Sequence, residues 1–161
     1  MMKRVFTAFL CVALTLAIGA IGAIGSAQAP AFYAELVRPD WAPPAKVFGP
    51  VWTTLYVLIG IALYLVWSRR TTSPSANSWL GLFAVQLAVN AVWSWLFFEW
   101  RLGLWAFVDC ALLAVLVGVL VWRARPVSGV AALLLLPYLA WVSFATVLSW
   151  TMWQLNPALL G

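Results

Sequence analysis

The sequence contains no histidine and very few charged side chains. Only 8% of its 161 residues are charged, whereas 66% are hydrophobic. Because soluble domains carry about 25% charged residues, a chain this poor in charge cannot cover a water-facing surface. These deficits indicate an integral membrane protein and argue against a soluble enzyme or binding domain.

The missing histidine and the scarce cysteine exclude several kinds of site. Without histidine, the usual His-ligated metal and haem sites are not available. Cys11 and Cys110 both lie inside apolar runs, so the chain has no disulfide framework. The basic residues occur singly or in pairs at segment ends and form no nucleic-acid-binding patch. We therefore predict no metal, no resident cofactor and no nucleic-acid partner.

Five apolar runs are each long enough to cross a membrane. A spanning helix needs about 20 residues, and the runs cover residues 5–25, 47–67, 79–98, 102–122 and 128–153. Polar segments separate them, and Pro126 blocks helix continuation before the last run. We expect an all-α, five-helix integral membrane bundle with antiparallel neighbours. It would form one domain, residues 1–161, whose longest connection is 26–46.

The first run also has features of a secretory signal. It follows a basic start and ends in Ala27-Gln28-Ala29. However, its apolar stretch of about 20 residues exceeds the usual 7–15 of a signal core. Glycines 19, 22 and 25 also suit close helix packing. We favour retention as the first membrane helix, and cleavage is the alternative.

The basic residues predict an orientation. Five crossings place six of them on the side of the N-terminus: Lys3, Arg4, Arg69, Arg70, Arg123 and Arg125. The other side holds Arg38, Lys46 and Arg101. By the positive-inside rule this asymmetry favours a cytoplasmic N-terminus, with the C-terminus and the 26–46 connection outside. A bacterial cell membrane is the expected location.

Twelve tryptophans are unevenly placed along the chain. An interfacial aromatic belt accounts for those near span ends, namely Trp67, Trp79, Trp100, Trp122, Trp150 and Trp153. Trp52, Trp93, Trp95, Trp105 and Trp141 lie further inside. For each inner tryptophan, ordinary helix packing and ligand contact are both open interpretations.

Helical spacing gathers unusual residues on one face of each later span. The sets are Trp52, Tyr56, Gly60 and Leu63; Gln86, Asn90, Trp93 and Phe97; Trp105 and Asp109; and Trp141, Ala145, Leu148 and Met152. Pro137 precedes the last set and is expected to bend its helix. Most of these residues fall in the half of the bilayer beneath the 26–46 connection.

Three polar side chains inside the spans have two interpretations each. Asp109 is the only ionisable group well inside a span, and a carboxylate there must face the bundle interior or be protonated. It would serve either as a ligand or proton contact or as a hydrogen-bond partner for a neighbouring helix. Gln86 and Asn90 carry the same ambiguity, because amides often join membrane helices.

The stretch WAPPAKVFGPVWTTLY, residues 41–56, suggests a stiff cover over an aromatic cavity. Its prolines rigidify the chain just before Trp52 and Tyr56, which offer flat apolar faces with one polar edge. Arg38 and Lys46 would stand at the rim. Such a cavity suits a large planar hydrophobe that carries an acidic group.

Three ordered motifs resemble the TspO/MBR family of tryptophan-rich sensory and translocator proteins. They are FYAELVRPDWAPPAKVFGPVWTTLY (32–56), QLAVNAVWSWLFF (86–98) and PYLAWVSFATVLSW (137–150). The resemblance implies a five-helix bundle, commonly a homodimer, that binds tetrapyrroles such as protoporphyrin IX and in some members sterols or benzodiazepine- or isoquinoline-type drugs. By motif position it implies as pocket residues Trp41, Trp52, Asn90, Trp93, Trp105, Asp109, Trp141, Ala145 and Leu148. Tyr56 and Gln86 join them from the shared helix faces.

The sequence departs from the family pattern near the end of the last span. Leu148-Ser149 stands where the family usually has Leu-Asn, which weakens one polar contact. The following LSWTMWQLN lacks the Tyr and Lys or Arg of the animal sterol pattern, so we do not expect sterol binding. A small-residue pair, Ala84 and Ala88, together with the family resemblance, predicts a homodimer through the third span.

A membrane receptor or sensor for tetrapyrroles is the predicted function. One alternative is light- and oxygen-dependent porphyrin degradation, for which the resemblance implies Trp52 and Trp141 as the reactive pair. No acid–base or nucleophile constellation supports hydrolytic chemistry. A tetrapyrrole transporter is a further alternative, although the chain shows no inverted repeat. A helix-packing scaffold without a ligand is the remaining one.

Overall fold

The computed structural model describes residues 2–161, and all regular elements in that range are helical. In chain order they are α1 (Met2–Gly25), α2 (Ala29–Glu35), the 3-10 turn η1 (Ala45–Val47), α3 (Phe48–Trp67), α4 (Pro74–Ser94), the π-helical turn η2 (Trp95–Glu99), α5 (Gly103–Ala124) and α6 (Gly129–Leu155). Five of the helical segments are long and apolar enough to cross a membrane. The prediction of an all-α, five-span bundle is confirmed.

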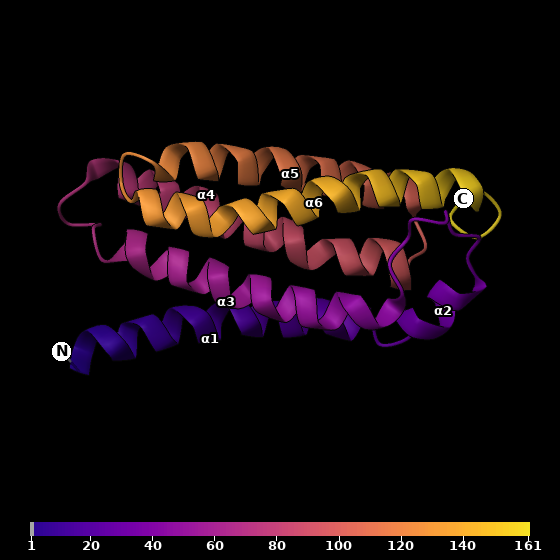
Figure 1. Ribbon diagram of the computed structural model, residues 1–161, viewed down its shortest axis with the longest axis horizontal. Coiled ribbons are helices and arrows are strands. Elements are labelled where there is room, and N and C mark those ends of the chain that lie inside the picture. The colour runs from indigo at the N-terminus through magenta and orange to yellow at the C-terminus, as the bar shows by residue number, and fades with distance from the viewer. Residues whose placement is uncertain (1) are drawn as a thin grey trace.

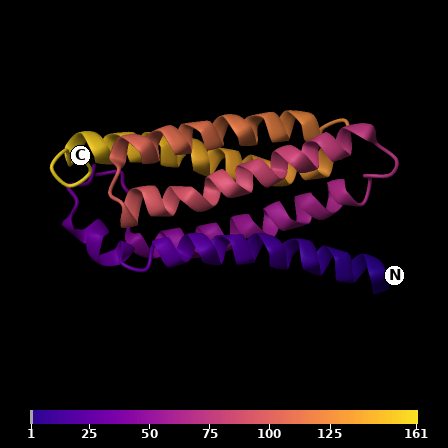
Figure 2. The same cartoon turned by 180° about the vertical axis from the view of Figure 1, so that it is seen from behind.

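The five long helices form a closed ring of neighbours (Figure 1). Helix α1 packs against α3 and α4, α3 packs against α6, and α5 packs against both α4 and α6. The segment 26–46 and the C-terminus meet at one end of this ring, which we call the loop end. The N-terminus and the turn 68–73 lie at the opposite, basic end, as the view from behind also shows (Figure 2).

Small residues set the close approach of α1 and α3. A Cβ atom on Gly60 would lie 2.6 Å from the Cα atom of Val12, so only glycine fits. Beside this contact, the Thr15 hydroxyl donates a hydrogen bond of 2.8 Å to the carbonyl of Tyr56. Backbone contact of this kind is a main source of helix association in lipid. Helix α1 is thus packed as a full member of the bundle.

The boundaries of the five spans lie within three residues of the predicted ones, except at the start of the third span. The span predicted from residue 79 begins five residues earlier, because Pro74 suits the first turn of a helix and follows the extended Ser73. The predicted 26–46 connection is not a plain loop, since it contains α2 and η1. Pro137 lies inside α6 without ending it.

Candidate functional site: a cavity beneath the 26–46 segment

A cavity of about 420 Å³ opens between α1, α3 and α4, beneath α2. Its aromatic wall consists of Tyr33, Phe48, Trp52, Tyr56, Trp93 and Phe98. The facing wall, from α1, is made of small residues, among them Gly19, Ala20, Gly22 and Ala23. This volume lies within the range of about 300–1,000 Å³ that is usual for small-molecule sites.

A separate narrow pocket, which we call the extension, lies beside this cavity on the side of α6. It has a volume of about 20 Å³ and shares Tyr33, Trp52 and Trp93 with the main cavity. Helix α6 contributes Trp141, Ala145, Leu148, Ser149 and Met152 to its wall. The predicted residues of the second, third and fifth spans, with the exception of Gln86, line one of these two spaces beneath the 26–46 segment.

Aromatic contacts hold the wall in place. The Trp52 ring stacks on Tyr56 with centroids 5.6 Å apart, and Trp93 stacks on Phe97 at 5.4 Å. Phe48 meets the Trp141 ring edge-on at 5.9 Å. Such pairs contribute about 0.5–1.5 kcal/mol each beyond the burial of their area. The wall is thereby largely formed before any ligand enters.

A buried polar network forms the inner boundary of the cavity. The Tyr56 hydroxyl donates to the Asn90 amide oxygen, and the Asn90 amide nitrogen donates to the Tyr138 hydroxyl at 2.9 Å. Tyr138 in turn donates to the Gln86 side-chain oxygen at 2.9 Å. The network joins α3, α4 and α6, so both amides link helices. Asn90 also lines the cavity, whereas Gln86 lies behind it.

Two tryptophans of the extension keep an unused hydrogen-bond donor. Within residues 2–161, the buried indole nitrogens of Trp93 and Trp141 have no acceptor. A buried N–H group without a partner costs about 1–3 kcal/mol. A ligand that offers an acceptor at this place would recover that energy.

The cover of the cavity is fixed at several points. The Tyr33 hydroxyl donates to the Pro43 carbonyl at 2.8 Å, and the Arg38 guanidinium lies 5.1 Å from the centre of the Tyr33 ring. Burial raises the pKa of the Tyr33 phenol, and the nearby Arg38 partly opposes that shift, so the hydroxyl stays a donor. Asn156, at the end of α6, pairs with both backbone groups of Val37.

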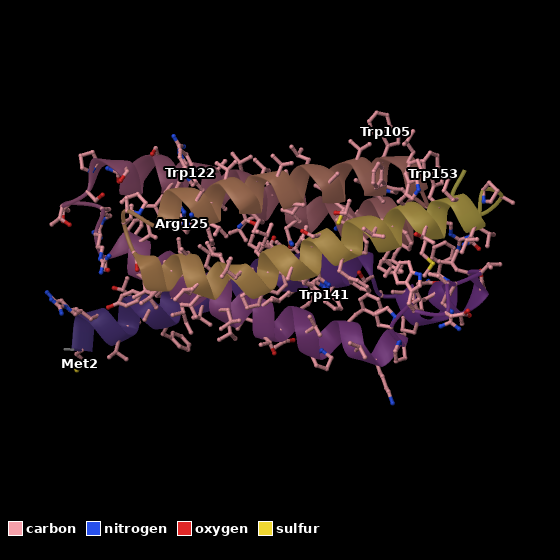
Figure 3. All side chains as sticks on the ribbon, turned by 45° about the horizontal axis from the view of Figure 1, so that its top comes forward. Met2, Trp105, Trp122, Arg125, Trp141 and Trp153 are labelled. Carbon is pink, nitrogen blue, oxygen red and sulfur yellow. The ribbon has the colours of Figure 1, made fainter. Side chains whose placement is uncertain are left out.

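The structure does not bring every predicted residue to the cavity. Trp105 is 60% exposed and projects away from the bundle (Figure 3), because Ala106 and Cys110 occupy the buried face of α5. Asp109, one turn on, is half-buried and lines neither the cavity nor its extension. Its carboxylate oxygen Oδ2 has no partner within residues 2–161.

The loop residues of the prediction lie outside the lining. Trp41 is 49% exposed and packs edge-on against Phe144 at 5.8 Å. Arg38 and Lys46 are exposed on the 26–46 segment, and Ala45, next to Lys46, does line the cavity. These side chains belong to the cover and the rim.

Sequence reasoning missed the α1 wall and Tyr138. The sequence signal for the α1 wall is the spacing of its glycines. The structure shows one reason for that spacing, because a Cβ atom on Gly19 would lie 2.4 Å from the Tyr56 ring. In the sequence, the spacing indicates only close helix packing. Tyr138 follows Pro137 in the third quoted motif, but a tyrosine inside a span does not reveal its partners.

The fold and the site define a five-helix membrane protein with an aromatic cavity of the size and lining that small-molecule sites have. The TspO/MBR family pattern matches residues 11–154. The chain belongs to the TspO/MBR family.

Three relatives, two from bacteria and one from human, support this assignment. The chain is 40% identical to the tryptophan-rich protein TspO of Chlorobaculum tepidum over 98% of its own length and 100% of that protein. It is 42% identical to the human translocator protein over 78% of this chain and 75% of the relative. Protein CrtK of Rhodobacter capsulatus is 36% identical over 86% of each chain. Family membership and five spans define a multi-pass integral membrane protein and support a sensor or receptor role.

Proposed function

We propose that this protein is a receptor that binds a tetrapyrrole of the protoporphyrin IX type in the cavity between α1, α3 and α4. The observation that carries the proposal is the aromatic wall of Trp52, Tyr56 and Trp93 opposite the small residues of α1. A flat apolar ring system can lie against Trp52 and Trp93, whereas at Gly19 helix α1 already contacts the Tyr56 ring and bounds the site.

The polar groups support a ligand that carries acidic substituents. Arg38 and Lys46 at the rim offer two cations to an acidic ligand. Glu35 and Asp40 on the same segment are also exposed, so the segment as a whole carries charges of both signs. The indole nitrogens of Trp93 and Trp141 are buried and unpaired, and rotation of either ring toward the cavity would let a ring nitrogen or carboxylate oxygen accept from it. Benzodiazepine- or isoquinoline-type drugs are flat and aromatic, and we propose that they compete for the same space.

A spectral titration tests this proposal. Protoporphyrin IX added to the detergent-solubilised protein should give a saturable shift of its absorbance band and quench tryptophan fluorescence. The Trp52→Phe variant should bind about 2- to 12-fold more weakly, which corresponds to about 0.5–1.5 kcal/mol for an aromatic contact.

Two exposed tryptophans provide matched controls. Trp122 is 66% exposed at the basic end, and Trp105 is exposed on α5. The variants Trp105→Phe and Trp122→Phe should bind like the wild type. A missing spectral shift, or an equal loss in the control variants, would contradict the proposal.

Porphyrin degradation is a second candidate, because Trp52 and Trp141 both line the narrow extension. If the pair reacts, illuminated wild-type protein should give a distinct porphyrin product in the presence of oxygen. Trp52→Phe and Trp141→Phe should then bind porphyrin but lose the product. If protoporphyrin IX bleaches at the same rate with and without the protein, the degradation proposal fails and only the receptor proposal remains.

The inner boundary of the cavity does not support transport. Beyond Tyr56 and Asn90, the backbones of α1 and α3 meet at Val12 and Gly60. A ligand of porphyrin size has no open path through this contact.

We also propose that the loop end faces outward and that the protein dimerises through α4, where Ala84 and Ala88 are exposed.

A further inference from the structure

A second, polar cavity lies at the basic end of the bundle, far from the aromatic one. It has a volume of about 380 Å³ and opens between the start of α1 and the end of α3. Its lining consists of Lys3, Arg4, Thr7, Tyr64, Trp67, Ser68 and Arg70. Three cationic side chains thus surround one small space.

No acidic side chain lies at this end to neutralise them. Of the four acidic residues, Glu35, Asp40 and Glu99 belong to the loop end, and Asp109 lies in the second turn of α5 from that end. The basic end carries six of the nine Lys and Arg residues. The positive potential of the basic end is therefore not balanced by acidic side chains of the described chain, and it favours binding of an anion from outside the protein.

The arginine of the cavity is preorganised. The guanidinium of Arg70 lies 4.3 Å from the centre of the Trp67 ring, and its Nη1 donates to the Trp67 carbonyl at 3.0 Å. One bond leaves the remaining N–H groups of the fork free, and an arginine fork matches phosphate geometry. The neighbouring Arg69 is used differently, because its guanidinium bonds to the Val127 carbonyl.

We propose that this cavity binds the phosphate headgroup of an anionic phospholipid from the leaflet at the basic end. Exposed Trp67 marks the interfacial depth at which headgroups lie. Basic pockets between membrane helices are a known mode of headgroup binding. Lys3 and Arg4 on α1 and Arg70 after α3 would share one phosphate, so the bound lipid would join these two helices.

A lipid titration with charge-matched variants tests the site. The full-length protein in mixed micelles is titrated with phosphatidylglycerol or with phosphatidylcholine, and retained lipid is counted by native mass spectrometry. The pocket variant combines Arg4→Gln with Arg70→Gln. The control combines Arg123→Gln with Arg125→Gln, which removes two exposed charges that do not line the cavity. Arg125 lies at the same end of the bundle (Figure 3).

The wild type should retain phosphatidylglycerol in preference to phosphatidylcholine. Each interfacial cation strengthens anionic lipid binding about fivefold. Both variants lose this general attraction, and the pocket variant should lose about a further tenfold in affinity, because the two arginines it replaces also donate charge-assisted hydrogen bonds to the phosphate. Circular dichroism and the melting temperature without added lipid verify that both variants are folded.

Two outcomes would overturn the proposal. Equal losses in the two variants would mean that the basic end attracts anionic lipid only through its general field. If inorganic phosphate displaces phosphatidylglycerol at a concentration similar to that of the lipid, the cavity is a site for free anions and not for a lipid headgroup. The readout does not involve the aromatic cavity, so it is independent of tetrapyrrole binding.

Discussion

At the residue scale, the Tyr138 hydroxyl connects the two buried amides of α4. It accepts from Asn90 and donates to Gln86 in a fully buried position. Tyr138→Phe would leave two buried amides without this partner, so we expect a loss of about 1–2 kcal/mol in the free energy of unfolding. Denaturant unfolding in detergent, followed by circular dichroism, measures it.

The matched control for this change is Tyr64→Phe. Tyr64 lies at the basic end, and its hydroxyl takes no part in the network. Its removal should alter the free energy of unfolding by less than about 0.5 kcal/mol. An equal effect of both substitutions would show that the network adds no stability.

At this scale the sequence predicted the type of residue better than its partners. The face formed by Asn90 and Trp93 could be read from helical spacing, and both residues line the cavity. Trp105 could not be judged in the same way. It follows the apolar pattern of α5, and only the rotation of that helix against α4 and α6 turns its ring outward.

At the scale of elements, Gly60 controls the distance between α1 and α3. An added Cβ atom would meet the backbone of Val12 at 2.6 Å, which cannot yield without moving a helix. Gly60→Ala should therefore lower the free energy of unfolding by about 1–3 kcal/mol. It should also weaken porphyrin binding, because α1 forms one wall of the cavity.

Gly118→Ala is the control for Gly60→Ala. Gly118 lies inside α5, and a Cβ atom added there would come no closer than 4.0 Å to its neighbour, the Leu139 side chain. Because alanine favours helix, the substitution should leave stability unchanged or raise it by up to about 1 kcal/mol. Thermal unfolding of the two variants side by side separates overpacking from helix propensity.

The C-terminal end of α6 holds the cover of the cavity through Asn156. This side chain bonds to the N–H and C=O groups of Val37 and to the Met152 carbonyl. Asn156→Ala should speed amide exchange of the 37–40 segment by about tenfold or more and accelerate ligand release. Exposed Gln154, changed to Ala, should leave exchange unchanged. If amide exchange of the 37–40 segment is unchanged in Asn156→Ala, aromatic packing and not Asn156 holds the cover in place.

Hydropathy predicted the long elements well, because length and apolar content are properties of each segment alone. It did not predict α2, which is only seven residues long. A helix this short depends on tertiary contacts. Phe32 packs against Phe97, and Tyr33 against Phe48, so α2 is stabilised by residues far along the chain.

At the scale of the whole molecule, the charge asymmetry predicts the direction of insertion. A cysteine at exposed position 45, in Ala45→Cys, should react with an impermeant maleimide in intact cells. A cysteine in Ser75→Cys should react only after the membrane is opened. Cys11 and Cys110 are buried and give little background. The reverse labelling pattern would invert the orientation and leave the fold unchanged.

The assembly of two chains is the last prediction. Ala84 and Ala88 lie one turn apart on the exposed face of α4, where small residues allow two backbones to approach. The double variant Ala84→Leu and Ala88→Leu should shift the solubilised protein from dimer toward monomer, as measured by light scattering during gel filtration. Ala17→Leu and Ala140→Leu enlarge exposed alanines on α1 and α6 and should keep the dimer. Dissociation by either control instead would place the contact on that helix.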